Sequence, residues 1–203
     1  NSTRAIKALR YCDLLITNSH FNHKRYVNLF PHADQTKILN PGVDLSVFKP
    51  SNNLKLDLNI LKLPFQHSHV ILSVGRLVEK KNHDLVLRCL PKVLERFPEL
   101  LYIIVGDGPE FQYLQELSVR LNINKKVLFY GSEIGKKIVS LYNICDIFVL
   151  PSKERSMDDQ GKIDAETFGI VFMEANACGK PVIGGNSGGI PDAIVNDVTG
   201  YLV

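Results

Sequence analysis

Short runs of Val, Ile and Leu recur along the chain, and a turn residue followed by a segment of helical period comes after most of them. The runs are apolar throughout, which is typical of strands covered on both faces of a parallel sheet. Strands are therefore expected at residues 14–17, 70–75, 101–106, 127–131, 147–150 and 181–184. Helical patterns lie at residues 82–96, 110–121, 135–143 and 168–177. This alternation predicts an α/β fold with a doubly wound parallel sheet and right-handed crossovers.

The composition excludes several classes of protein. The chain has 203 residues, with 24 Lys or Arg against 21 Asp or Glu, and this net charge of +3 is too small to indicate a nucleic-acid partner. The longest apolar runs, at 100–105 and 147–150, are too short to span a bilayer. The six histidines include two close pairs, but neither has a cysteine or carboxylate cluster nearby, so no metal site is expected.

The cysteines indicate a reducing compartment. They form no CxxC pair, and each lies in an apolar segment, so we expect buried free thiols. They are Cys12, Cys89, Cys145 and Cys178.

The beginning of the chain differs from the rest. A strand at 12–17 leads to Asn18-Ser19, a favourable helix N-cap, and a basic helix is expected at 20–30. We interpret residues 1–48 as the end of one domain with its linker, and residues 49–203 as a second domain.

Two other segments bear on this division. Residues 51–68 are polar, with one short helical pattern near 54–63. Residues 199–203 read as a strand with no closing helix, so we expect the chain to be part of a longer protein.

A basic loop, from Gly75 to Asn82, follows the second expected strand. Ligands of open α/β sheets bind beyond the carboxyl ends of strands, and Arg76 and Lys81 there suit a diphosphate. The helix that follows would add the positive end of its dipole. The alternative is a solvated basic loop without a ligand.

A glycine motif, Gly106-Asp107-Gly108, follows the third expected strand. Two glycines allow close approach of a ligand, but residue 111 is Phe, so the dinucleotide fingerprint is incomplete. A tight turn with Pro109 at the start of a helix is the favoured interpretation.

Two glutamates, Glu166 and Glu174, flank the start of the last expected helix. Their spacing lets both line one cleft, and Gly169 would let a ligand reach the first-turn amides. Alternatively, Glu166 is only a carboxylate at the start of a helix, where it interacts favourably with the helix dipole and needs no ligand. Glu174 has apolar neighbours and needs a partner, which a hydroxyl-rich ligand would supply. A flexible glycine loop is expected at 184–189.

These motifs, in this order, resemble those of the retaining nucleotide-sugar glycosyltransferases of GT-B fold, the family called glycosyl transferases group 1. The resemblance covers nearly the whole chain, and residues 169–191 are most similar to phosphatidylinositol-mannosyltransferase-like members. It is carried by Glu166 and Glu174, the 75–81 loop, Gly106-Asp107-Gly108, Gly188-Gly189 before Pro191, and the string Asn40-Pro41-Gly42-Val43-Asp44 to Phe48. It implies that residues 49–203 are a Rossmann-like donor-binding C-terminal domain, truncated at its end.

The resemblance also implies roles for residues. Arg76 and Lys81 would hold the donor diphosphate and stabilise the leaving nucleotide, and Glu166 would contact the transferred sugar. Glu174 would accept hydrogen bonds from the ribose, and Phe129 or Tyr130 would lie near the nucleobase. The other expected donor-binding residues are Gly75, Asp107, Gly108, Gly169, Ile170 and Val171. Family members need no metal, so no cofactor is expected beside the nucleotide sugar.

The sequence departs from the family in two places. Asp192 stands where the family usually has Glu, and residues 152–164 form a charged insertion, interpreted as a solvated loop, that could reshape the sugar pocket.

The expected activity is retaining transfer from GDP-mannose or a UDP-sugar to a lipid or glycan acceptor, in the cytoplasm and in possible peripheral contact with a membrane. A glycosidase would not need Arg76 and Lys81 beside its glutamates, so that class is disfavoured. The alternatives are a donor-binding module without catalysis, and an epimerase or phosphorylase of the same fold.

Overall fold

The computed structural model describes residues 9, 11–30, 32–51, 61, 69–156 and 163–203, so most of the helical pattern near 54–63 lies outside the described residues. The strands are β1 (Leu15–Thr17), β2 (Thr36–Ile38), β3 (His69–Val74), β4 (Leu100–Val105), β5 (Val127–Gly131), β6 (Ile147–Leu150), β7 (Arg155–Ser156), β8 (Ile163–Asp164), β9 (Val182–Gly184) and β10 (Gly200–Leu202). The α-helices are α2 (His20–Tyr26), α4 (His83–Arg96), α5 (Phe111–Arg120), α6 (Lys136–Ile144) and α7 (Ile170–Ala177).

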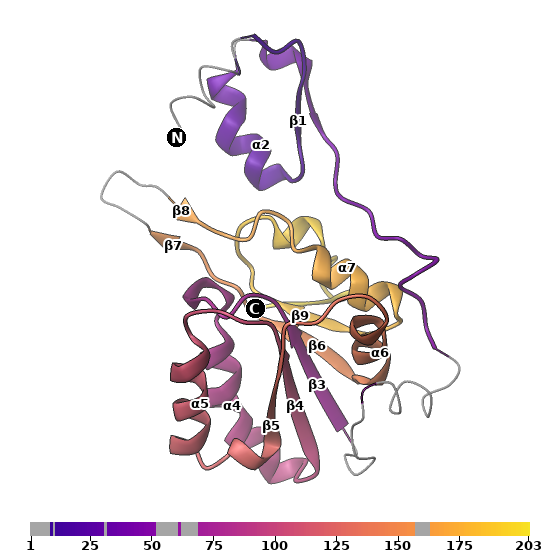
Figure 1. Ribbon diagram of the computed structural model, residues 1–203. Coiled ribbons are helices and arrows are strands. Elements are labelled where there is room, and N and C mark those ends of the chain that lie inside the picture. The colour runs from indigo at the N-terminus through magenta and orange to yellow at the C-terminus, as the bar shows by residue number, and fades with distance from the viewer. Residues whose placement is uncertain (1–8, 10, 31, 52–60, 62–68, 157–162) are drawn as a thin grey trace.

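A parallel sheet of six strands organises the larger part of the chain, with the order β10-β9-β6-β3-β4-β5. The chain builds outward from β3 to β5 and then returns to place β6 on the other side of β3. Helices α4 and α5 cover one face, and α6 and α7 cover the other (Figure 1). The predicted doubly wound α/β fold is therefore confirmed, and the order reverses between β3 and β6, where ligands of such sheets bind.

Strand β4 shows why the apolar runs are continuous. All six of its residues are buried. Leu101, Ile103 and Val105 belong to the core beneath α6 and α7. Leu100, Tyr102 and Ile104 belong to the core beneath α4 and α5. A strand that supplies two cores has no face left for polar residues.

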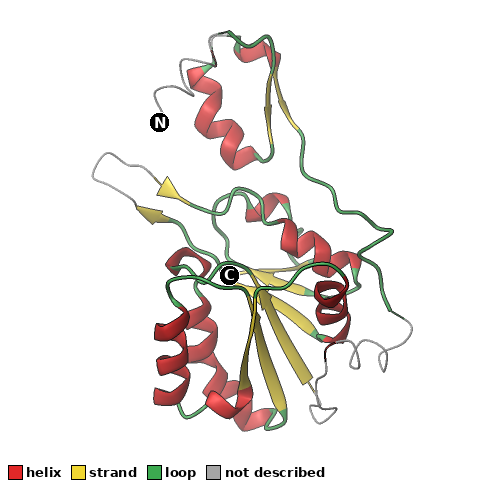
Figure 2. Ribbon diagram, viewed as in Figure 1, coloured by secondary structure: helices red, strands yellow, loops and turns green. Residues whose placement is uncertain are grey.

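A smaller unit lies beyond the carboxyl edge of the large sheet (Figure 1). In it β1 and β2 pair in parallel, joined through α2. Ser19 caps α2 as expected, since its Oγ accepts the amide of Asn22 at 3.2 Å. The helix ends earlier than the expected 20–30, at Tyr26, and a 3-10 turn continues it to Leu29. Figure 2 shows the loop that leaves this unit after β2 and runs toward the larger part of the chain.

Three strands were not predicted from the sequence. Strand β2 has only three residues and no apolar run. Strands β7 and β8 pair antiparallel as a ribbon with two residues each, within the charged insertion. Strand β10 confirms the strand expected near the end of the sequence.

The prediction that all cysteines are buried is half wrong. Cys145 and Cys178 are buried, but Cys12 and Cys89 are exposed. Cys89 lies on the part of α4 that faces away from the core, because Val86, Leu87 and Leu90 occupy the buried positions of that helix. In the described part of the chain, no helix combines the length and hydropathy that crossing a bilayer requires.

Candidate functional site

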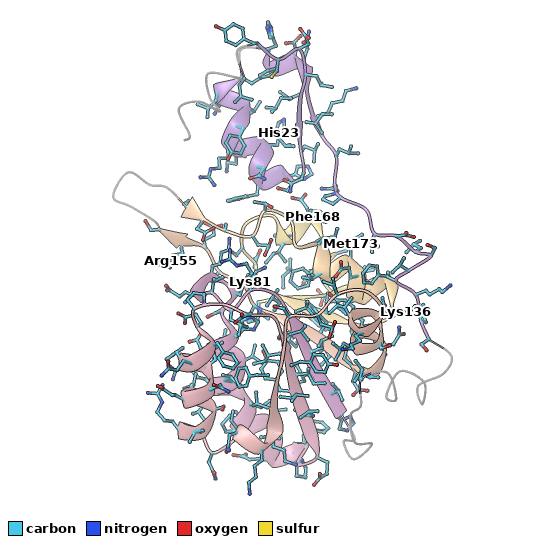
Figure 3. The ribbon with its side chains drawn as sticks, viewed as in Figure 1. His23, Lys81, Lys136, Arg155, Phe168 and Met173 are labelled. Carbon is cyan, nitrogen blue, oxygen red and sulfur yellow. The ribbon has the colours of Figure 1, made fainter. Side chains whose placement is uncertain are left out.

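The loop after β3 and the turn before α7 meet at the carboxyl edge of the sheet. Lys81 Nζ donates a short hydrogen bond to Glu166 Oε2, although 85 residues separate them in the sequence. Their side chains are only 13% and 17% exposed, so this ion pair is largely shielded from water. The expectation that the basic loop meets an acidic residue of the later motif is confirmed for these two residues. Figure 3 shows Lys81 at this edge, between Arg155 on one side and Phe168 on the other.

A second ion pair lies beside the first. Lys80 Nζ contacts Asp164 Oδ1 at 2.6 Å. Two adjacent lysines of one loop therefore hold two carboxylates, those of Asp164 at the end of β8 and Glu166 two residues later. Sequence reasoning missed Asp164, because it placed that residue in a solvated insertion.

The insertion is tied to the same edge of the sheet rather than solvated throughout. Arg155 Nη1 lies 3.1 Å from a carboxylate oxygen of Glu79 in the basic loop. Glu154 Oε1 accepts the amide of Gly188 at 3.1 Å. The described ends of the insertion therefore join two loops of the edge, and residues 157–162 lie outside the described residues.

Arg76 differs from Lys81 in being exposed. The structure shows no hydrogen bond or ion pair of its guanidinium to any described residue. Its neighbour Gly75 is held by its amide, which donates to Val105 O at 2.9 Å. An anchored backbone with an unpaired guanidinium is suited to receiving an anion.

Glu174 already has a protein partner, contrary to the expectation that a ligand must supply one. The hydroxyl of Tyr142 on α6 donates to Glu174 Oε2 at 2.7 Å. Burial, with the adjacent Glu174 carboxylate second, raises the pKa of Tyr142 well above its usual value, so the phenol stays protonated as a donor. The other carboxylate oxygen, Oε1, has no hydrogen bond within the described residues and can still accept one from a ligand.

The glycines after β4 serve loop packing rather than ligand approach. A Cβ at Gly106 would lie 2.0 Å from Gly75 O, and one at Gly108 would lie 2.4 Å from Leu77 O. Asp107 is held in the same turn, since its side chain accepts the Gly108 amide at 2.7 Å. The interpretation as a tight turn is confirmed, although α5 begins two residues after Pro109, at Phe111.

The glycine loop at 184–189 is packed, so the expectation of a flexible loop is wrong. A Cβ at Gly185 would lie 2.0 Å from Ser152 O, and one at Gly188 would lie 2.3 Å from Glu166 O. The amide of Gly189 donates to Glu166 O at 2.8 Å. This loop therefore fixes the backbone of Glu166.

Helix α7 begins with Gly169 in the left-handed region, at φ +91°. A Cβ there would meet the ring of Phe172 at 2.7 Å, so local packing alone requires glycine. No described side chain caps this helix, so its first-turn amides, including those of Ile170 and Val171, have no cap from the described part of the chain.

Phe129 and Tyr130 have packing roles. Phe129 packs on the α4–α5 core and lies edge-on to Phe111, with ring centroids 5.6 Å apart. Tyr130 packs against the other core. Their assignment to the nucleobase stays a prediction.

Sequence reasoning also missed His83, the first residue of α4. It is 2% exposed, and neither ring nitrogen has a hydrogen-bond partner among the residues that the structure describes. Burial first, and then the charge of Lys81, lowers its pKa from 6.5 to about 4. His83 is therefore a neutral ring beneath the basic loop.

The sequence profile of the family described as "Glycosyl transferases group 1" matches residues 61–203. The chain belongs to this family. Among curated members, a GDP-mannose-dependent alpha-(1-6)-phosphatidylinositol monomannoside mannosyltransferase of Mycolicibacterium smegmatis is 29% identical over 191 residues, covering 94% of this chain and 49% of that protein. A D-inositol 3-phosphate glycosyltransferase of Saccharomonospora viridis is 30% identical over 201 residues, covering 94% and 44%.

Solved glycosyltransferase structures share the fold. Anabaena Alr3699/HepE in complex with UDP and glucose superposes with a TM-score of 0.77 at 26% identity, covering 95% of this chain and 49% of that one. Sucrose-phosphate synthase from Thermosynechococcus elongatus gives a TM-score of 0.79 at 25% identity, covering 100% and 49%. The chain thus spans about half the length of the glycosyl transferases group 1 proteins that it matches.

Proposed function

We propose that the protein is a glycosyltransferase that takes its sugar from a nucleotide-diphosphate donor, GDP-mannose or a UDP-sugar, and transfers it with retention to a lipid or glycan acceptor. The observation that carries the proposal is the shielded contact between Lys81 and Glu166 at the edge where the strand order reverses. The names of the relatives support a GDP-mannose donor, and the HepE complex supports a UDP donor.

The two cations suit the leaving group. As the bond from the sugar C1 to the phosphate oxygen lengthens, negative charge grows on the diphosphate, and Arg76 and Lys81 stabilise it there. No metal ion is needed in this proposal, because the two side chains supply the positive charge. The acceptor hydroxyl attacks C1 on the face that the nucleotide leaves, and the departing phosphate oxygen takes its proton.

The glutamates have different tasks. Glu166, held by Lys81 and by the glycine loop, accepts hydrogen bonds from the transferred sugar and favours positive charge near C1. Glu174, oriented by Tyr142, accepts a ribose hydroxyl with its open Oε1. The uncapped amides of α7 contact the phosphate and sugar oxygens.

We further propose that residues 49–203 are the donor-binding domain and that residues 1–48 end a preceding domain. We also propose that the enzyme acts in the cytoplasm, at the face of a membrane. The phosphatidylinositol in the name of one relative supports a lipid acceptor.

Calorimetry of the natural full-length protein with GDP, UDP and ADP tests the proposal. One of these nucleotides should bind, and the matching sugar donor should be consumed with release of that nucleotide. Binding without turnover of any donor would reduce the protein to a donor-binding module. Failure of all three to bind would overturn the proposal.

A further inference from the structure

The start of helix α2 contacts the part of the chain that surrounds Glu166. Asn18 Nδ2 donates to Thr167 Oγ1 at 3.4 Å, and the amide of His20 donates to Asp192 Oδ2 at 2.8 Å. The ring of His20 contacts the other oxygen of Asp192 through Nδ1. Figure 1 shows α2 above the segment that leads into α7. The smaller unit is therefore tied to the larger part of the chain beside the candidate site.

Asp192 holds α2 with both oxygens of its carboxylate. Its side chain is 12% exposed, whereas that of His20 is 77% exposed. The first amides of a helix have no partner inside the helix. At α2, Ser19 accepts the amide of Asn22, and Asp192 accepts the amide of His20. A carboxylate from the larger part of the chain therefore completes a cap that the smaller unit begins.

The segment that carries Asp192 also fixes the backbone of Glu166. The amide of Asp192 donates to Gly189 O at 3.1 Å, and the amide of Gly189 donates to Glu166 O at 2.8 Å. A Cβ at Gly189 would lie 2.1 Å from Thr167 O, so this loop packs directly on the turn before α7. A short chain of contacts thus runs from α2 through Asp192 to the residue assigned to the transferred sugar.

The last turn of α2 is tied to the same region. Arg25 Nη1 donates to Ile163 O at 3.2 Å, at the first residue of β8. The next residue of that strand, Asp164, binds Lys80 of the basic loop. Helix α2 is therefore held at both ends by segments that adjoin Glu166, with Asp192 at its first residue and β8 at its last turn.

We propose that Asp192 is a positioning residue for the transfer. Its carboxylate keeps α2, and with it the smaller unit, in a fixed place over the turn that carries Glu166. An acceptor bound to the domain that this unit ends then meets the sugar at a constant distance. The proposal rests on the proposed glycosyltransferase function, because positioning matters only where a second substrate must reach the sugar.

The test compares the natural full-length protein with Asp192→Ala, which removes both contacts to His20. Asp192→Glu restores a carboxylate, and Asp34→Ala is the control, because it removes an exposed aspartate of the smaller unit. Binding of GDP and UDP is measured by calorimetry, and unfolding midpoints are recorded. Turnover is followed as the nucleotide released from GDP-mannose or UDP-glucose, with phosphatidylinositol vesicles as the acceptor.

A distance measurement reports the arrangement of the two units directly. Cys12 in the smaller unit and Cys89 on α4 are both exposed, so a nitroxide label can be placed on each. Any other exposed cysteine of the full-length protein is replaced by serine. The distribution of spin–spin distances is then recorded for wild type and for every variant.

Asp192→Ala should broaden the distance distribution and lower kcat at least about tenfold, because a misplaced acceptor reacts slowly. Nucleotide affinity should stay at the wild-type value, since within the described residues no hydrogen bond or ion pair joins Asp192 to Arg76, Lys81 or Glu174. Asp192→Glu should narrow the distribution again and turn over faster than Asp192→Ala. Asp34→Ala should match wild type in every measurement.

A wild-type distance distribution or a wild-type kcat in Asp192→Ala would overturn the proposal, as would an equal loss in the control variant. Weaker nucleotide binding in Asp192→Ala together with a lower unfolding midpoint would indicate a structural role alone, and would also overturn it. Absence of nucleotide binding or turnover in wild type would instead contradict the proposed function. The distance distributions would still decide whether Asp192 holds the two units together.

Discussion

The phenol of Tyr142 on α6 and the carboxylate of Glu174 on α7 form a 2.7 Å hydrogen bond inside the core that these helices share. The bond fixes a carboxylate that would otherwise lie among apolar side chains. It links the packing of the domain to the orientation of a group assigned to the donor ribose.

Tyr142→Phe should therefore affect both stability and donor binding. Loss of the hydroxyl leaves Glu174 without its donor, and we expect about 1–3 kcal/mol of lost unfolding free energy in urea, with weaker nucleotide binding. Tyr113→Phe is the matched control. It also removes a tyrosine hydroxyl, but that hydroxyl accepts a hydrogen bond from Arg88 at an exposed position. Equal losses in both variants would contradict the assigned role of the Tyr142 hydroxyl.

Lys81→Met should lower turnover by about a hundredfold or more, since a cation that stabilises the leaving diphosphate is removed while the length of the side chain is kept. The measurement is kcat with the identified donor, together with the unfolding midpoint. Lys153→Met removes an exposed lysine near the same edge and should retain wild-type turnover. A Lys81→Met enzyme with wild-type kcat would eliminate Lys81 as a catalytic residue.

Asp164→Asn should loosen the β7–β8 ribbon without unfolding the domain. The Lys80–Asp164 pair is partly exposed, so its loss should cost no more than about 1 kcal/mol of global stability. Amide exchange at Arg155 and Ile163 should nevertheless accelerate. Glu99→Gln removes the exposed Lys126–Glu99 pair elsewhere and should leave exchange in the ribbon unchanged. Unchanged exchange in Asp164→Asn would show that the pair does not hold the ribbon.

Gly106→Ala should destabilise the protein by about 2–4 kcal/mol, because its φ is +138° and a Cβ would lie 2.0 Å from Gly75 O. The measurement is urea denaturation. Gly42→Ala should be nearly neutral, since a Cβ there meets no atom of the described residues within 4 Å. Similar stabilities for the two variants would refute the close approach of the two loops.

His83 should make stability depend on pH. Its folded pKa of about 4 lies below its ordinary value of 6.5, so the unfolded chain binds the proton more readily. The contribution of His83 is complete above pH 6.5 and is lost as pH falls toward about 4, by about 3 kcal/mol in all.

His83→Phe should flatten the pH dependence of the unfolding free energy between pH 4 and 6.5, whereas His69→Gln, at an exposed position, should keep the wild-type slope. An unchanged slope in His83→Phe would mean that the ring titrates normally in the folded protein.

Much of the fold follows from local pattern. Strand β4 was located to within one residue because six buried apolar residues allow no amphipathic alternative. Helix α4 was located similarly, because Val86, Leu87 and Leu90 repeat at helical spacing. The ribbon was not predicted, since two-residue strands carry no periodicity.

The sequence by itself determined the α/β alternation, the loops that reach the carboxyl edge of the sheet, and the residue types available there. Only the tertiary structure decided which atoms meet: Lys81 with Glu166, Lys80 with Asp164, and Tyr142 with Glu174. It also decided that the glycines pack loop against loop. The physical reason is that residue spacing sets periodicity within one element, whereas contacts between distant segments depend on strand register and on the close packing of whole loops.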